Sequence, residues 1–265
     1  MIKMIAGETF TSATGDYKIV FQDGPLSCSV AGGTNYLIKY KDGTSETVFF
    51  PPGFFAERIG GYNITNTTKE YVCHSGGCPG ADMMWENEGL KYGVKTISYS
   101  FHNHKQEGRN QKILTRDELE EGYAAARVAD RTLKRNFDNI QYPYVKNLLA
   151  RNWFQVKNAD CIFAIAKKFV SDTIVDGGTG WAVQMAIDNK KDVYVYDQSN
   201  SYSLWWMYHY VDYSIYNPEF IQTNKFIPLL GKITLTNSFA GIGTRDLTDG
   251  GKNAIVEVYK NTFEK

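Results

Sequence analysis

The sequence predicts an α/β fold, with a Rossmann-like, mostly parallel sheet that has helices on both faces and a small N-terminal antiparallel β module. From about residue 70 onward, short apolar runs alternate with helix-like segments, which is typical of a parallel sheet covered on both sides. Before residue 65 the chain shows short alternating segments separated by turn residues, which is typical of hairpins. We therefore expect a β module over residues 1–65 and a Rossmann-like domain over residues 66–265.

In the β module, turn residues separate the expected strands. The strands are Tyr17–Phe21, Leu26–Val30, Tyr36–Tyr40 and Glu46–Phe50. The breaks are Asp23-Gly24-Pro25, Gly32-Gly33 and Asp42-Gly43, all residue types that tolerate turn geometry. A Pro-Pro-Gly run at 51–53 closes the module, and the polar stretch 63–69 has the composition of a linker.

The remaining elements follow in the order strand, loop, helix. Strands are expected at Tyr71–His74, Val94–Tyr99, Cys161–Ala166, Asp192–Tyr196, Ile233–Leu235 and Phe239–Ile242. Helices are expected at Ala81–Tyr92, Thr115–Arg135, Tyr144–Lys157, Trp181–Asn189 and Lys252–Thr262. Thr115 and Glu118 have the spacing of a capping box at the start of the long second helix. In open sheets of this kind ligands bind at the carboxyl ends of the strands.

Composition excludes several classes of protein. The 29 basic residues balance 29 acidic ones, so no overall field attracts nucleic acid or a membrane surface. The sequence has no apolar run of transmembrane length and no secretory signal pattern, and its four cysteines are expected as reduced thiols. We therefore expect a cytoplasmic protein with no membrane partner and no nucleic-acid partner.

Three glycine-rich turns carry the functional signal. They are Ser75–Asp82, Asp176–Ala182 and Ala240–Arg245, and each lies between an apolar run and a helix-like segment. Glycine allows the backbone to approach a phosphate closely, and a helix start offers free N–H groups and a positive dipole end. Three such turns in one chain indicate a nucleotide-shaped ligand.

The motifs together resemble the SLOG superfamily of Rossmann-like proteins, which includes the lonely-guy phosphoribohydrolases. The matching elements are Ser75–Asp82 with Glu86, Arg151-Asn152 with Gln155, Gly177–Ala182, and Ala240–Arg245. The last of these is the element with which the family pattern begins. The resemblance covers roughly Glu70 to the C-terminus, and it implies a circularly permuted SLOG-like domain.

The resemblance implies a set of ligand-binding residues. These are Ser75, Gly76, Gly77, Gly80, Arg151, Asn152, Gln155, Gly177, Gly178, Thr179, Gly180, Trp181, Gln184, Gly241, Gly243, Thr244 and Arg245. The phosphoribohydrolase pattern has a catalytic glutamate where this chain has Gln184, and an amide cannot replace a carboxylate base. Binding of a nucleotide or nucleotide-derived molecule, such as an ADP-ribose-type signal, is therefore favoured over hydrolysis of an N-glycosidic bond. Hydrolysis would need Glu86, Asp82 or Asp176 as the catalytic group.

The sequence leaves several alternative interpretations open. The aromatic run from Tyr194 to Tyr216 is a packing layer or an interface between copies, or some of its rings, such as Trp205, stack on a base. His102 and His104 are expected to face solvent, and neither a metal nor a cofactor is expected. Family members commonly assemble, so the resemblance also implies a homo-oligomer. A third hypothesis is an interaction protein with a vestigial ligand site.

Overall fold

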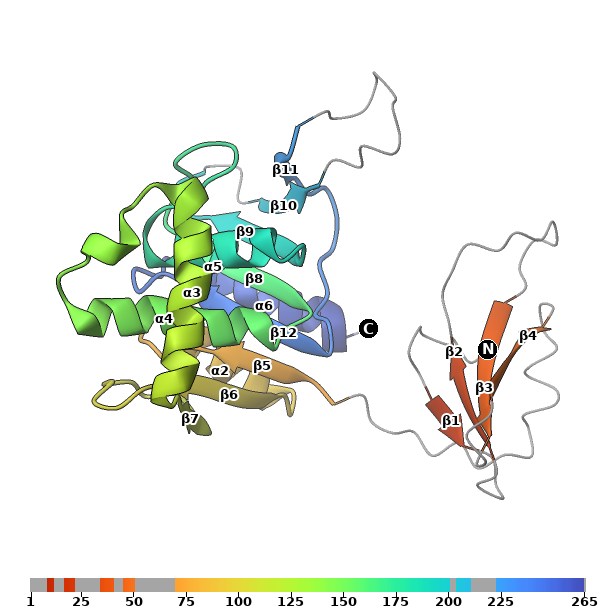
Figure 1. Cartoon of the computed structure of the whole chain (residues 1–265). Helices are drawn as coiled ribbons and strands as arrows, with labels where there is room; N and C mark the ends of the chain where they lie inside the picture. Colours follow the sequence, from red (N-terminus) through yellow and green to blue (C-terminus); the bar gives the residue numbers. More distant parts are fainter. Residues whose placement is uncertain are drawn as a thin grey trace. The chain divides into compact units, whose positions relative to one another are not determined.

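The computed structural model describes residues 70–200, 204–210 and 223–264, together with the backbone of four strands nearer the N-terminus. The chain divides into two compact units, Met1–Glu70 and Tyr71–Lys265 (Figure 1).

The first unit contains one antiparallel sheet with the strand order β1-β2-β3-β4. The strands are β1 (Thr9–Thr11), β2 (Tyr17–Phe21), β3 (Thr34–Tyr40) and β4 (Ser45–Phe50). Three of the expected strands are present, and β1 was not predicted. The fourth expected strand, Leu26–Val30, lies outside the described residues.

The second unit is built on an eight-stranded sheet with the order β11-β10-β9-β8-β12-β5-β6-β7. Its strands are β5 (Val72–Ser75), β6 (Lys95–Ser100), β7 (Gln111–Ile113), β8 (Cys161–Ala166), β9 (Asp192–Asp197), β10 (Trp205–His209), β11 (Lys225–Pro228) and β12 (Ser238–Gly243). The six strands that follow one another in the sheet as β9, β8, β12, β5, β6 and β7 are parallel. At the other edge, β10 pairs antiparallel with β9, and β11 pairs antiparallel with β10. The predicted Rossmann-like α/β class is confirmed.

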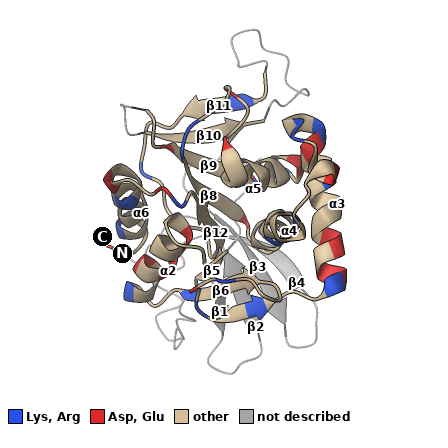
Figure 2. Cartoon of the chain, turned by 90° about the vertical axis from the view of Figure 1, so that its left-hand side faces the viewer, with Lys and Arg blue, Asp and Glu red and all other residues tan. Residues whose placement is uncertain are grey.

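In the described part of this unit, five helices cover the sheet on both faces (Figure 2). They are α2 (Ala81–Lys91), α3 (Arg116–Leu133), α4 (Pro143–Lys157), α5 (Gly177–Asp188) and α6 (Asp249–Phe263), and a short 3-10 turn, η1 (Phe137–Asn139), follows α3. The capping box of α3 is present, since the side chains of Thr115 and Glu118 each accept from the other residue's backbone N–H. Among the described residues, no helix is both long enough and apolar enough to cross a bilayer.

Alternation along β8 explains the two-sided core. All six residues of this strand are buried, and successive side chains of a strand point to opposite faces. Ile162 and Ala164 pack in the core beneath α3, α4 and α5, whereas Phe163 and Ile165 pack in the core beneath α2 and α6. A strand buried on both faces must be a continuous apolar run, which is what the sequence has there.

The strand expected at Ile233–Leu235 is wrong. Both side chains are buried in the core beneath α2 and α6, but the backbone there belongs to no strand. The alternating apolar residues are buried, as in a strand, but they belong to an irregular connection that leads into β12. The short strands β7, β10 and β11 were not predicted.

The last strand of the chain occupies the centre of the sheet. β12 pairs in parallel with β8 on one side and with β5 on the other. A Cβ atom at Gly241 would lie 2.5 Å from Cγ of Trp85, so glycine there allows α2 to pack closely on β12. This topology brings the carboxyl ends of β5, β8 and β12 to one rim of the sheet.

Candidate functional site

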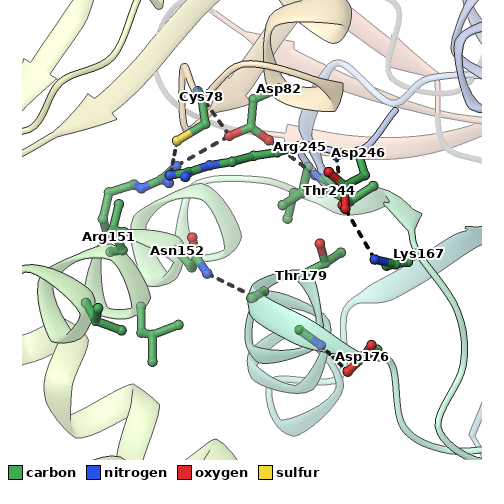
Figure 3. Close-up of a pocket in the computed structure, with 17 residues that line it drawn as sticks. Cys78, Asp82, Arg151, Asn152, Lys167, Asp176, Thr179, Thr244, Arg245 and Asp246 are labelled. Atoms are coloured by element: carbon green, nitrogen blue, oxygen red, sulfur yellow. Dashed lines mark hydrogen bonds and ion pairs between the residues drawn. The ribbon is translucent and has the colours of Figure 1, made fainter. Parts of the chain in front are cut away.

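A cavity of about 470 Å³ lies at the carboxyl ends of β5, β12 and β8 (Figure 3). It is lined by Cys78, Asp82, Val145, Leu148, Leu149, Arg151, Asn152, Lys167, Asp176, Gly177, Gly178, Thr179, Ile242, Gly243, Thr244, Arg245 and Asp246. These residues come from the β5–α2, β8–α5 and β12–α6 connections, from the end of β12, from the first turns of α2 and α5, and from α4. The three glycine turns thus share one cavity.

The first and last glycine turns touch through their backbones. Gly80 precedes α2 with a φ of 97°, and a Cβ atom there would lie 2.6 Å from Cα of Arg245. The N–H of Ala81 donates to the carbonyl oxygen of Thr244 at 3.0 Å. Glycine is required at position 80 for both the positive φ and the close approach.

Asp82 fastens these two turns together. One carboxylate oxygen accepts the Gly243 N–H at 3.2 Å, and the other accepts the Cys78 N–H at 3.5 Å and lies 3.6 Å from Nη1 of Arg151. Burial raises the pKa of this carboxyl group, and the Arg151 charge opposes that rise. The carboxylate is therefore engaged in holding the site.

Arg151 extends from α4 toward Cys78 and Asp82 (Figure 3). Its guanidinium donates to Oε1 of Gln155 at 3.2 Å and to Sγ of Cys78 at 3.4 Å. A Cβ atom at Gly76 would lie 1.3 Å from Nη1, so the guanidinium fills the space above this glycine. Nε of Arg151 and Nε2 of Gln155 are buried and make no hydrogen bond to a described residue. Buried donors of this kind are normally satisfied by a ligand or by water.

The turn between β5 and α2 is shaped by its own hydroxyl and by a neighbouring loop. Oγ of Ser75 accepts the N–H of Gly77 at 3.1 Å, and Gly77 has a φ of 64°. The carbonyl oxygen of Gly77 accepts the N–H of Glu107, which lies in the β6–β7 connection, at 3.2 Å. Ser75 and Gly77 therefore set the turn conformation and do not line the cavity.

The start of α5 forms another wall. Asp176 caps the helix by accepting the Gly177 N–H at 2.8 Å, and Asn152 of α4 donates to the Gly178 carbonyl oxygen at 3.3 Å. Gly177, Gly178 and Thr179 form the first turn of the helix, where backbone N–H groups have no partner within the helix. Together with the helix dipole, these groups favour an anion at this end of the cavity.

Arg245 is a cation of the cavity lining that is open to a ligand. Its side chain is exposed, and no carboxylate among the described residues lies within ion-pair distance of it. The neighbouring Lys167 is paired with Asp246 at 3.3 Å. Arg245 therefore retains its guanidinium donors for a ligand at the cavity mouth.

His104 contributes to this region, although the sequence predicted that it would face solvent. It lies in the β6–β7 connection, is half-buried and stacks on Phe101 with ring centroids 4.6 Å apart. Its Nε2 lies 3.9 Å from Sγ of Cys78, and its Nδ1 lies 3.3 Å from Oγ of Ser100. Desolvation, followed by the charges of Arg151 and Arg245, lowers its pKa to about 4. His102 is exposed, as predicted.

Glu86 lies away from the cavity that it was expected to serve. It is completely buried and accepts hydrogen bonds from Oγ of Ser98 at 2.7 Å and from the Arg109 N–H at 2.8 Å. Residue 86 is one helical turn beyond Asp82, and at that depth it faces β6. Its carboxylate anchors the β6–β7 connection, the same segment that carries His104.

The candidate residues Gly180, Trp181 and Gln184, which follow the first turn of α5, do not line the cavity. Trp181 is buried in the core with its ring centroid 5.8 Å from that of Phe137, and Gln184 donates to Asp188 at 2.8 Å. A Cβ atom at Gly180 would lie 2.0 Å from the carbonyl oxygen of Val175, so this glycine serves packing. Only the first turn of α5 reaches the cavity.

The described part of the aromatic run, Tyr194 to Tyr210, does not line this cavity either. Trp205 is buried and packs edge-on against Tyr196 and Phe163, in the core beneath α2 and α6. Tyr213 and Tyr216 lie outside the described residues. The apolar wall comes instead from α4, through Val145, Leu148 and Leu149. The sequence did not distinguish this wall from ordinary core because apolar residues of the same helix, such as Val156, pack in the core.

Comparison with known proteins identifies no relative. No family model, curated protein or solved structure matches the chain. The cavity and the residues that line it are therefore the features that indicate a function.

Proposed function

We propose that the second unit binds a nucleotide or a nucleotide-derived small molecule. The observation that carries this proposal is that glycine turns from three distant parts of the sequence line one cavity of about 470 Å³. Cavities of roughly 300–1,000 Å³ with a few convergent polar groups are typical of small-molecule sites.

The cavity has a polar end and an apolar wall, and this difference supports an orientation for the bound nucleotide. The phosphate lies at the first turn of α5 beside Arg245, where the N–H groups that follow the capped Gly177 and a positive charge meet. The sugar and base lie against Val145 and Leu148 of α4, which supply apolar contact area.

The carboxylates support binding over hydrolysis. Glu86 is buried outside the cavity, and Asp82 is occupied by two backbone N–H groups and Arg151. Gln184 is bonded to Asp188. Of the predicted catalytic groups, only Asp176 lines the cavity without an ion pair among the described residues, and it serves as a helix cap.

We infer further that the unit is a circularly permuted SLOG-like domain. A contact between its two ends supports this inference, because the ring centroids of Tyr71, before β5, and Phe263, at the end of α6, are 4.9 Å apart. In the family order the segment β12–α6 would lead directly into β5. The two ends are therefore close enough for a short connection between α6 and β5.

Calorimetry with AMP, ADP, ADP-ribose and adenosine tests the proposal. We expect at least one phosphorylated ligand to bind, and Arg245→Ala to weaken its affinity about tenfold, equivalent to about 1.4 kcal/mol. Arg131→Ala is the matched control, since Arg131 is exposed on α3 and does not line the cavity. The proposal is wrong if no compound binds, or if both variants weaken binding equally. Chromatography of the same mixtures detects released base, which would favour the hydrolytic alternative.

A further inference from the structure

The guanidinium of Arg135 holds the chain on both sides of the α5 cap. Arg135 lies between α3 and η1 in the chain. Its Nη2 donates to the carbonyl oxygen of Val175 at 2.7 Å, and its Nη1 donates to that of Gly177 at 2.8 Å. A planar group that donates two hydrogen bonds fixes the orientation as well as the position of the chain that it binds. Arg135 does not line the cavity, so it acts there through the residues that it holds.

The position of Arg135 is itself fixed by Asp130 of α3. The backbone N–H of Arg135 donates to Oδ1 of Asp130 at 2.7 Å, and the N–H of Phe137 donates to the other carboxylate oxygen at 2.9 Å. Phe137 is buried in the core, so the short segment that carries Arg135 is anchored at both ends. The guanidinium therefore reaches the start of α5 from a defined place.

The carbonyl groups that are held determine where the N–H groups of this turn lie. The Gly177 carbonyl and the Gly178 N–H belong to one planar peptide unit, as do the Gly178 carbonyl and the Thr179 N–H. Arg135 holds the first of these units, and Asn152 of α4 holds the second by donating to the Gly178 carbonyl oxygen at 3.3 Å. Side chains from two other elements thus fix the N–H groups that have no partner within the helix.

The space beside this turn is open, and a second observation indicates a ligand there. A Cβ atom at Gly177 or Gly178 would meet nothing within 4 Å. Arg151 lines the same cavity and is only 5% exposed, and its Nε makes no hydrogen bond to a described residue. A buried donor of this kind is normally satisfied by a ligand or by water.

Arg135 also brings positive charge close to Asp176. The Asp176 carboxylate accepts the Gly177 N–H at 2.8 Å, and its negative charge opposes a phosphate at the same helix start. Desolvation lowers the pKa of Arg135, and the charges of Asp176 and Asp130 oppose that fall, so the guanidinium and the cap attract each other. Arg135 therefore offsets part of the repulsion between Asp176 and a phosphate.

We propose that Arg135 is a positioning residue for the phosphate of the bound nucleotide, because it fixes the Gly178 N–H group and offsets the charge of Asp176. The phosphate contacts α5, and Arg135 acts through that helix from outside the cavity. The role toward phosphate rests on the proposed nucleotide function, whereas the fixing of the turn does not.

Hydrogen exchange in the ligand-free protein tests whether Arg135 fixes the turn. The peptide that contains residues 177–182 is followed by mass spectrometry in wild type, Arg135→Ala and Arg131→Ala, the last being an exposed position in the final turn of α3. We expect this peptide to exchange at least about fivefold faster in Arg135→Ala and at the wild-type rate in Arg131→Ala. Unchanged exchange in Arg135→Ala would overturn the proposal. If this variant does not fold, Arg135→Lys replaces it, since lysine keeps the charge and lacks the planar fork.

Calorimetry tests the role toward phosphate. Adenosine is compared with the tightest ligand among AMP, ADP and ADP-ribose. We expect Arg135→Ala to weaken binding of the phosphorylated ligand about tenfold and to leave adenosine unaffected, and Arg135→Lys to weaken it about threefold. Equal weakening of both ligands would show a general structural effect and contradict the positioning role.

An Asp176→Asn background isolates the offset of charge. We expect Arg135→Ala to weaken phosphate binding only about threefold in this background, because the charge to be offset is absent. The same weakening in both backgrounds would exclude the electrostatic part of the proposal. If none of the phosphorylated compounds binds the wild-type protein, the proposed function is wrong, and the exchange measurement still decides whether Arg135 fixes the start of α5.

Discussion

Gly76 has no side chain, and the guanidinium of Arg151 occupies the space that one would fill. At this scale several candidate residues hold neighbouring groups in place and do not offer free atoms to a ligand. Asp82 joins two turns, and Ser75 shapes one of them. The residue types in the motif are therefore explained largely by the geometry of the turns.

Substitution of Gly76 tests this packing. We expect Gly76→Ala to lower the free energy of unfolding by about 1–3 kcal/mol, because the new methyl group displaces a buried, bonded guanidinium. Gly178→Ala is the control, since a Cβ atom there meets nothing within 4 Å, and its effect should stay within about 0.5 kcal/mol. Urea denaturation measures both. Equal effects of the two substitutions would contradict the packing argument.

His74 gives the protein a pH dependence in the acid range. Its ring nitrogens lie 3.0 Å from Tyr99 Oη and 3.0 Å from Ser238 Oγ, and desolvation lowers its pKa to about 4. The unfolded chain takes up this proton near pH 6.5, whereas the folded chain takes it up only near pH 4. Protonation therefore favours unfolding, and stability decreases as pH falls from about 6.5 to 4.

We expect His74→Gln to reduce this loss of stability by about 2 kcal/mol, because the amide keeps hydrogen-bonding capacity and does not titrate. His102→Gln, at an exposed position, should leave the pH dependence unchanged. The measurement is urea denaturation at pH 7 and pH 4. Parallel curves for His74→Gln and wild type would show that another group is responsible.

At the scale of elements, the first turn of α5 combines two opposing features. Its N–H groups and dipole favour an anion, yet its cap, Asp176, places a negative charge beside them. The cap stabilises the helix in the absence of ligand. A phosphate at this helix start would therefore bind against some electrostatic repulsion.

Removal of the Asp176 charge should strengthen binding. We expect Asp176→Asn to increase affinity for a phosphorylated ligand about threefold to tenfold and to leave adenosine unaffected, because asparagine is also a good cap. Asp117→Asn, in the exposed first turn of α3, is the control for a change in overall charge. Calorimetry distinguishes the outcomes. Weaker binding, or loss of any base release, would identify Asp176 as a ligand-binding or catalytic group.

At the scale of the whole molecule, the ends of the second unit are adjacent and its last strand is central. The order of the segments along the chain is thus separable from the fold that they form. Association of copies stays a prediction from the resemblance, as does the cytoplasmic location.

A rearranged chain tests this separability. We expect a chain with residues 231–264, a short glycine-serine linker and residues 71–230 to fold as residues 71–265 do. The linker spans a short distance because Tyr71 contacts Phe263, and the new ends lie beside Leu230, which is 87% exposed. Circular dichroism and cooperative thermal unfolding compare the two chains. A chain opened instead between Leu148 and Leu149, inside α4, should fail to fold cooperatively. If the chain that begins at residue 231 does not fold cooperatively, the inference of a circular permutation is contradicted.

The sequence by itself determined what depends on local pattern. The continuous apolar run of β8, the Thr115–Glu118 capping box and the three glycine turns all have periodicities or spacings that a single element imposes. From these, the α/β class and the rim of the sheet that carries the cavity could be predicted. The convergence of the first and last turns was also inferred, through the resemblance.

Only the tertiary structure decided which side chains reach the cavity. Glu86 and Gln184 match motif positions, yet packing against β6 and Asp188 directs them elsewhere. His104, in the β6–β7 connection, contacts Cys78 of the cavity wall but does not itself line the cavity. The direction of a side chain depends on neighbours distant in sequence, because burial and hydrogen bonding are settled between elements. The spacing of residues along one element does not indicate which distant residues will be its neighbours.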